Sequence, residues 1–292
     1  MTEPTGGALI LVATPIGNLG DLPPRAVEAL AAADAVACED TRRSGRLLAG
    51  IGVRAPVLLV VNDHTERERC ADIVRRVAAG ERVALITDAG TPGISDPGER
   101  VVRAVLDAGL AVEAVPGPAA LVMALVLSGL DTSRFAFDGF LPRRGAERRI
   151  RLDDVARERR TVVLYEAPHR LARTLDDLAA ACGGDRSVVL ARELTKLHEE
   201  VWRGSLHDAV AHVAEVAPRG EYVVVLAGAA PPAVADDAEL HAAIAAELAT
   251  GASTRDAVAA VAAASGISKK RVFDLAHLDP GGPDRADLPT TP

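Results

Sequence analysis

The alternation of short apolar runs with amphipathic segments predicts an α/β protein with two sheet-containing domains. Strands that alternate with helices usually form parallel sheets, so we expect a mainly parallel sheet in the first domain. Its apolar runs lie near residues 8–14, 35–38, 57–61, 83–87 and 112–115, with helical patterns over 25–33, 66–79 and 98–108. The runs of the second domain lie near residues 135–140, 161–166, 187–192 and 221–227.

Changes in composition divide the chain into four parts. The first domain covers residues 1–128, and the second covers 129–230 and ends at a linker with paired prolines. Alanine-rich segments over 236–278 contain a glycine turn followed by a basic helix, which indicates either a helix-turn-helix-like domain or a small helical cap. The polar tail over 279–292 is predicted to be disordered.

Several strand-like runs end in loops rich in glycine and proline. In VALITDAGTPGISDPG (Val83 to Gly98), the glycines let backbone approach a ligand, and Asp96-Pro97 offers an N-cap for the next helix. Ligands of open α/β sheets bind outside the carboxyl ends of the strands. Because no phosphate-loop or dinucleotide fingerprint is present, the ligand need not be a phosphate.

Seven blocks, in order along the chain, carry a resemblance to a known family. The blocks are VATPIGNLGDL (Val12 to Leu22), CEDTRRSGRLL (Cys38 to Leu48), TDAGTPGISDPG (Thr87 to Gly98), VPGPAAL (Val115 to Leu121), GFLPRR (Gly139 to Arg144), YEAPHRL (Tyr165 to Leu171) and ARELTKLHEEVWRG (Ala191 to Gly204). The chain resembles the ribosomal RNA small subunit methyltransferase I family, a branch of the tetrapyrrole methylases.

The resemblance implies two α/β domains with S-adenosyl-L-methionine in a cleft between them and a small C-terminal helix-turn-helix-like domain. It also implies a homodimer that methylates the 2′-oxygen of a cytidine in the 16S rRNA of the small ribosomal subunit. Two other functions stay open. A tetrapyrrole or other small-molecule methylase would have no use for the arginine clusters, and a non-catalytic regulator would bind a metabolite in the body and DNA with its last helices.

The glycine-rich and proline-rich loops and the resemblance together give a candidate cofactor site. Small residues there would permit close approach to backbone groups. The candidates are Pro15, Gly17, Asp88, Gly90, Thr91, Pro92, Gly93, Ser95, Pro116, Gly117, Ala119, Ala120, Tyr165, Glu166 and Arg192.

Methyl transfer from a sulfonium requires alignment above all, and a general base would help a ribose hydroxyl to react. Lys196 could serve as a base only if neighbouring cations depress its pKa. Each candidate has a structural alternative: Asp88 could anchor its loop, and Glu166 and Glu193 could pair with Arg170 and Lys196. The candidates are Asp88, Glu166 and Lys196, with His64 and Glu193 as further possibilities.

The net charge of −8 argues against RNA binding, but the local distribution of charge favours it. Residues 143–160 hold eight arginines and four acidic residues, although a solvated helix face would give the same pattern. Seven aromatic residues are too few for extensive base stacking. The RNA-binding candidates are Arg42, Arg43, Arg143, Arg144, Arg148, Lys196, Lys269, Lys270 and Arg271.

The remaining features indicate an ordinary cytoplasmic protein without a metal. Cys38, Cys70 and Cys182 fit neither a disulfide framework nor a zinc pattern, so we expect them to be reduced and structural. The apolar run from Leu121 to Leu127 is too short to cross a bilayer, and the N-terminus lacks the basic region of a signal peptide. We therefore expect no membrane partner.

Overall fold

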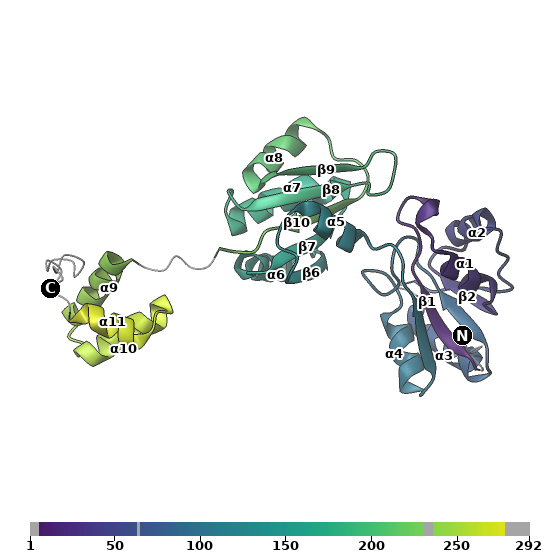
Figure 1. Ribbon diagram of the computed structural model, residues 1–292, viewed down its shortest axis with the longest axis horizontal. Coiled ribbons are helices and arrows are strands. Elements are labelled where there is room, and N and C mark those ends of the chain that lie inside the picture. Colours follow the sequence, from purple (N-terminus) through teal and green to yellow (C-terminus); the bar gives the residue numbers. More distant parts are fainter. Residues whose placement is uncertain (1–5, 63–64, 231–235, 278–292) are drawn as a thin grey trace, which may run out of the picture. The chain divides into compact units, whose positions relative to one another are not determined.

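The computed structural model describes residues 6–62, 65–230 and 236–277 (Figure 1). It divides into two compact units, which are treated separately: unit 1 is Met1–Ala229 and unit 2 is Ala230–Pro292. The candidate base His64 and the tail over 279–292 lie outside the described residues.

The first sheet of unit 1 is entirely parallel, as predicted. Its strand order is β3-β2-β4-β1-β5, so β1 lies between β4 and β5. All five strands end at the same edge, where the glycine-rich loops after β1 and β4 lie. The strands are β1 (Ala8–Val12), β2 (Ala35–Cys38), β3 (Leu58–Val60), β4 (Arg82–Leu85) and β5 (Ala111–Val115).

Helices cover both faces of this sheet. Alternate residues of a strand face opposite sides, so Ile10 packs in one core with Leu30 and Leu48, and Leu9 packs in another with Ile73 and Val101. The first face carries α1 (Pro24–Ala31) and α2 (Thr41–Gly50), with the short 3-10 helix η1 (Leu19–Asp21) before α1, and the second carries α3 (Glu66–Ala78) and α4 (Glu99–Asp107).

The second sheet is mixed, with strand order β6-β7-β10-β8-β9. Only β6 and β7 are parallel; β10 runs antiparallel to β7 and β8, so β10 starts at the edge where those two strands end. The sequence did not predict β9, an edge strand with no buried residue. The strands are β6 (Phe135–Phe140), β7 (Thr161–Glu166), β8 (Ser187–Arg192), β9 (Glu200–Ser205) and β10 (Tyr222–Leu226).

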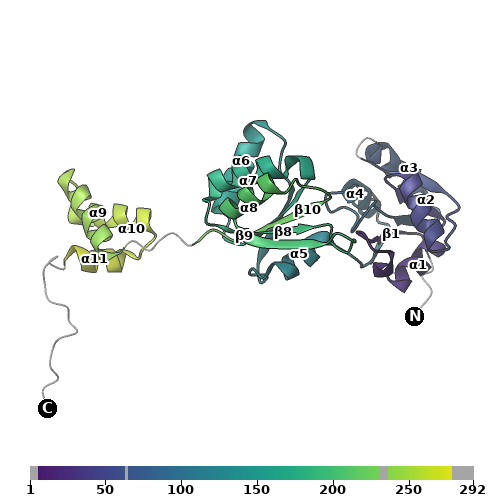
Figure 2. The same cartoon turned by 90° about the horizontal axis from the view of Figure 1, so that it is seen from above.

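Three helices cover one face of the second sheet, namely α6 (Gly145–Arg157), α7 (Pro168–Cys182) and α8 (Leu206–Glu215) (Figure 2). The helix α5 (Ala120–Ser128) covers the other face through Leu121, Ala124 and Leu125. The boundary expected at residue 128 would place α5 with the first sheet, which these contacts contradict. We propose residue 119 as the limit of the first α/β domain and retain 230 as the end of the second.

Helix α4 takes its N-terminal cap from another helix. The residue before it is Gly98, with φ of 143°, so the predicted N-cap at Asp96 is wrong. Instead, the carboxylate of the buried Glu66, at the start of α3, accepts hydrogen bonds from the backbone N–H groups of Gly98 at 2.9 Å and Arg100 at 3.2 Å. The Asp96 carboxylate accepts a hydrogen bond from the Thr87 hydroxyl at 3.0 Å. Glu66 therefore ties α4 and its preceding loop to α3.

Unit 2 contains three helices, α9 (Asp237–Ala249), α10 (Thr254–Ser265) and α11 (Lys269–Ala276). They share an apolar core that includes Leu240, Val261 and Val272. Gly266 ends α10 in the left-handed conformation, with φ of 69°, and gives the predicted helix, glycine turn and helix. The limits 236–278 of this domain remain our proposal.

Two further expectations can be compared with the described residues. The three cysteines are free, and Cys38 is buried. None of the described helices has both the length and the apolar character needed to cross a membrane.

We predict that Glu66→Ala lowers the free energy of unfolding by about 1–3 kcal/mol, because it leaves two N–H groups at the start of α4 without their acceptor. Chemical denaturation of the full chain measures this loss. The matched control is Glu68→Ala, an exposed residue of the same helix turn, which should change stability by about 0.5 kcal/mol or less. Equal losses in the two variants would show that the cap is not stabilising.

Candidate active site

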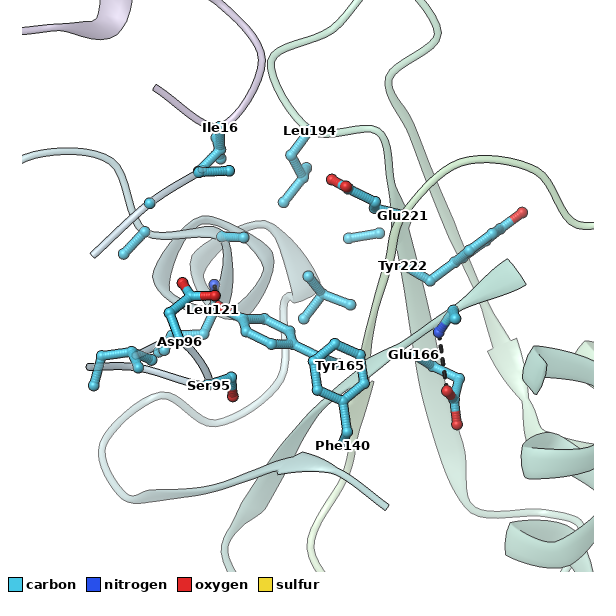
Figure 3. A pocket seen from close by; sticks show the side chains of 18 of the residues that line it. Ile16, Ser95, Asp96, Leu121, Phe140, Tyr165, Glu166, Leu194, Glu221 and Tyr222 are labelled. Carbon is cyan, nitrogen blue, oxygen red and sulfur yellow. Dashed lines mark hydrogen bonds between the residues drawn. The ribbon is translucent and has the colours of Figure 1, made fainter. Parts of the chain in front are cut away.

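A cavity of about 370 Å³ lies in unit 1, where loops from both sheets meet (Figure 3). The first α/β domain of unit 1 contributes Ile16 and the loop after β4, and α5 contributes its first turn. The second α/β domain contributes the ends of β6, β7 and β8 and the start of β10. Since β10 is antiparallel to its neighbours, all these segments meet at one edge of the second sheet.

Backbone and aromatic contacts fix the walls of this cavity. Gly90 pairs with Thr14 through backbone hydrogen bonds of 2.8 and 3.1 Å, which hold the loop after β4 against the loop after β1. The Tyr165 hydroxyl accepts a hydrogen bond from the backbone N–H of Leu121 at 3.3 Å, and the Tyr165 ring lies 5.7 Å from that of Phe140. Burial raises the pKa of Tyr165. These contacts join the loops of both sheets and the start of α5 around the cavity.

Lys196 is held between two carboxylates beside the cavity. Its Nζ lies 2.9 Å from Glu193 Oε1 and 3.0 Å from Glu221 Oε2. Burial acts to lower the pKa of Lys196, but the hydrogen bonds to Glu193 and Glu221 outweigh it and the pKa is raised. The expectation of a base with a depressed pKa is therefore contradicted, because the neighbours of Lys196 are anions and it stays an ammonium.

Glu166 also has its carboxylate fully engaged. It is 2% exposed; Oε1 lies 3.1 Å from Arg170 Nε and accepts from the Ala167 N–H at 2.9 Å, and Oε2 accepts from the Thr174 hydroxyl at 2.6 Å. The predicted ion pair with Arg170 is confirmed. Glu166 thus fixes the start of α7 at the cavity, which speaks against its candidacy as a base.

Asp88 lies outside the cavity and anchors the loop after β4. Its Oδ2 accepts a hydrogen bond from Arg43 at 3.0 Å, and its backbone N–H donates to Glu39 at 3.1 Å. The structure therefore supports the anchoring alternative and removes Asp88 from the residues that line the cavity. Among the residues that the structure describes, no cluster of His, Cys, Asp and Glu side chains is placed to hold a metal ion.

Comparison with known proteins assigns the chain to a family. The sequence profile of Tetrapyrrole (Corrin/Porphyrin) Methylases matches residues 8–210. A Synechocystis protein named Ribosomal RNA small subunit methyltransferase I is 49% identical over 77% of this chain and 80% of its own length. A protein of the same name from Mycobacterium tuberculosis H37Rv is 44% identical over 96% of this chain and 99% of its own length.

The chain belongs to the ribosomal RNA small subunit methyltransferase I family of tetrapyrrole methylases. The fold agrees with this assignment. A solved structure of uroporphyrin-III C-methyltransferase from Thermus thermophilus, complexed with S-adenosyl homocysteine, has a TM-score of 0.53 and 20% identity, covering 76% of this chain and 97% of its own. At that identity, the likeness shows the fold alone.

About half of the cofactor candidates line the cavity, and the others lie outside it. Gly17 lies against Lys196, and Gly117 lies against Ala13. Arg192 lies outside the cavity, donating to the Arg219 carbonyl and pairing with Glu200. The candidates that line the cavity are Gly90, Thr91, Ser95, Ala119, Ala120, Tyr165 and Glu166. Those that do not are Pro15, Gly17, Asp88, Pro92, Gly93, Pro116, Gly117 and Arg192.

The sequence missed most of the apolar lining. Leu121 and Leu194 lie inside recognised blocks, but nothing in their pattern separates a pocket wall from a core position. Glu221 and Tyr222 stand at the start of β10, where no motif marks them. Only the antiparallel pairing of β10 brings them to this edge. The other unpredicted lining residues are Ile16, Ala89, Ile94, Asp96, Phe140, Ala167, Pro168, Ala191 and Val223.

The RNA-binding candidates fall into two groups. Arg148 is only 4% exposed and bonds to Asp177, Thr174 and the Pro142 carbonyl, so its expected contact with RNA is contradicted. Arg271 is bound to Asp237 through both carboxylate oxygens. Arg271 is itself exposed, as are Arg42, Arg43, Arg143, Arg144, Lys269 and Lys270, and Lys196 lines the cavity.

We predict that Lys196→Met destabilises the protein at neutral pH, because Glu193 and Glu221 would then face each other without a cation. The raised pKa sets the pH range: the stabilisation by Lys196 is complete below the ordinary value of 10.5 and is lost as pH rises through the higher folded-state pKa. Thermal unfolding of the wild-type chain and the variant, from neutral pH to above pH 10.5, measures the difference in stability. A difference that already vanished near neutral pH would show a depressed pKa instead.

Proposed function

We propose that this chain transfers the methyl group of S-adenosyl-L-methionine to the 2′-oxygen of a cytidine in 16S rRNA within the small ribosomal subunit. The chain is a methyltransferase by family. The observation that carries the proposal is the convergence of the blocks TDAGTPGISDPG, YEAPHRL and ARELTKLHEEVWRG on one cavity, in a chain that matches the Mycobacterium protein over nearly its whole length. Resemblance to the family supplies the cytidine and the 2′-oxygen.

The cavity suits S-adenosyl-L-methionine in size, surface and charge. Its volume of about 370 Å³ falls within the range of small-molecule sites. Gly90, Ala119 and Ala120 leave room for the adenosine beside apolar side chains. The carboxylates that line the cavity outnumber its one cation, Lys196, which favours a positively charged sulfonium over a neutral thioether.

When bound, S-adenosyl-L-methionine supplies an electrophilic methyl group whose leaving group departs neutral. The chain's own part is to align the acceptor oxygen and exclude water, and proximity alone lowers such barriers by about 7–11 kcal/mol. Tyr165, Leu121 and Leu194 form the apolar walls that exclude water. An ammonium carries three N–H donors, and Lys196 uses two of them on Glu193 and Glu221. The third donor can position the ribose hydroxyl, whose oxygen forms the new bond to the methyl carbon while its proton passes through the exposed carboxylate of Glu221 to solvent.

Exposed arginines extend the site toward the RNA. Phe140 lines the cavity, and the exposed residues Arg143 and Arg144 follow it three and four positions later. Arg42 and Arg43 form a second exposed pair at the start of α2, where the side chain of Arg42 is 89% exposed. Such contacts with phosphates position a nucleic acid without reading its sequence.

The assembly and location belong to the same proposal. We propose a cytoplasmic homodimer, supported by α5, which buries one face and exposes Val122, Met123, Val126 and Leu127 on the other. An exposed apolar stripe of this kind marks a contact surface more often than a solvated one. The three helices of unit 2 are proposed to assist docking on the ribosomal subunit.

A panel of methyl acceptors tests the function. Purified chain with S-adenosyl-L-methionine is offered small ribosomal subunits, free 16S rRNA, uroporphyrinogen and duplex DNA. Transfer to rRNA, strongest in the subunit, is expected. Transfer to uroporphyrinogen alone would identify a small-molecule methylase, and DNA binding without any transfer would identify a regulator.

We predict that Gly90→Val weakens binding of S-adenosyl-L-methionine at least about tenfold, because the new side chain enters the cavity beside Ile16 and the backbone φ of 90° disfavours any side chain. Titration calorimetry measures the affinity. The matched control is Gly109→Val, which meets the same kind of strain, with φ of 71°, in open space. Equal affinity in the two variants would place the cofactor elsewhere.

We predict that the double variant Arg143→Ala, Arg144→Ala weakens rRNA binding and reduces its salt slope by about two, one for each arginine that no longer neutralises a phosphate. Cofactor affinity should stay unchanged. The control is Arg157→Ala, Arg159→Ala, an exposed pair near the other end of α6. An unchanged salt slope for the Arg143→Ala, Arg144→Ala variant would show that these arginines are solvated and do not contact RNA.

A further inference from the structure

Unit 2 contains a groove whose lining charges all have one sign. A cavity of about 630 Å³ lies between α10 and α11. It is lined by Thr254, Arg255, Val258, Ala259, Lys269, Lys270, Phe273 and His277. Three of these residues are cations and none is a carboxylate, so the groove favours an anionic ligand.

Two acidic residues of unit 2 have partners outside the groove. Asp237 forms an ion pair with Arg271 at 2.9 Å, and Asp256 accepts a hydrogen bond from the Ser253 hydroxyl at 2.7 Å. Within the described part of the chain, no ion pair links Arg255, Lys269 or Lys270 to a carboxylate. Their charges are therefore available to a ligand.

An aromatic ring faces this groove. Phe273 is 50% exposed, whereas its neighbours Val272 and Leu275 are buried in the core of unit 2. Its ring lies 4.2 Å from that of His277, whose Nδ1 is 2.9 Å from the Phe273 carbonyl oxygen. The ring is thus supported on one side while half of its surface stays open. An open aromatic ring among cations is the arrangement that binds unpaired bases.

We propose that this groove binds an unpaired nucleotide of the ribosomal RNA, with its base stacked on Phe273 and its flanking phosphates held by Arg255, Lys269 and Lys270. The inference rests on the proposed function for its substrate and gives unit 2 a binding site separate from methyl transfer. A nucleic-acid duplex fits less well, because its bases are already stacked and offer no free face to Phe273.

The direct test is the full chain carrying Phe273→Trp, titrated with a short single-stranded RNA and with the same strand in a duplex. The only native tryptophan, Trp202, lies in unit 1, so the wild-type chain is the blank. Stacking should quench the new tryptophan with the single strand and not with the duplex, and added salt should weaken the response. Equal quenching by both RNAs, or by polyglutamate, would overturn the inference.

Alanine variants provide the second readout. Phe273→Ala should raise the Kd for single-stranded RNA and the KM for small ribosomal subunits about fivefold or more, with kcat unchanged at saturation. The matched control is Leu248→Ala, an exposed apolar residue of α9 outside the groove, which should change neither value. An unchanged Kd and KM for Phe273→Ala would show that Phe273 does not contact the RNA.

The two proposals fail separately. If the wild-type chain transfers no methyl group to small subunits, the proposed function is wrong, whatever the tryptophan signal shows. If wild-type transfer is normal and Phe273→Ala retains the same KM, only the proposal that this groove binds RNA is wrong.

Discussion

One apolar cluster joins the two α/β halves of unit 1, and the cavity depends on it. In this cluster Ile16, from the loop after β1, packs with Leu121 and Leu125 of α5 and with Leu194 against the second sheet. Ile16, Leu121 and Leu194 also line the cavity. The side chains that join the halves are therefore partly the same as those that form the walls of the candidate site, so disruption of this packing would open the site to water.

The charges around the cavity also hold its parts in place. The carboxylates of Glu193 and Glu221 keep Lys196 protonated, and Glu166 is occupied by Arg170 and Thr174. These groups orient loops, and none of them is set up as a strong base. In the proposed reaction the site would act by alignment, exclusion of water and a fixed cation, since the leaving group departs neutral.

Local patterns predicted the first sheet well because its buried strands read as apolar runs between helices. The same patterns placed the domain boundary after α5, at residue 128, because a helix that is apolar on all sides does not show which surface it covers. Sequence reasoning also missed β9, an edge strand with no buried residue, and it took Arg148 for a surface residue although a partner 29 positions away in sequence neutralises it. Contacts between distant segments decide each of these points.

Some residues that line the cavity could be predicted from the sequence, and others could not. Gly90 and Tyr165 stand in blocks with visible signals, whereas Glu221 and Tyr222 reach the cavity only through the antiparallel pairing of β10. We propose that this cavity directs a methyl group to a ribose oxygen of ribosomal RNA. Mass mapping of 16S rRNA from subunits treated with the purified chain is the decisive measurement. A single 2′-O-methylated cytidine is expected, and a methyl group on a base, or no methylated nucleotide, would show that the proposal is wrong.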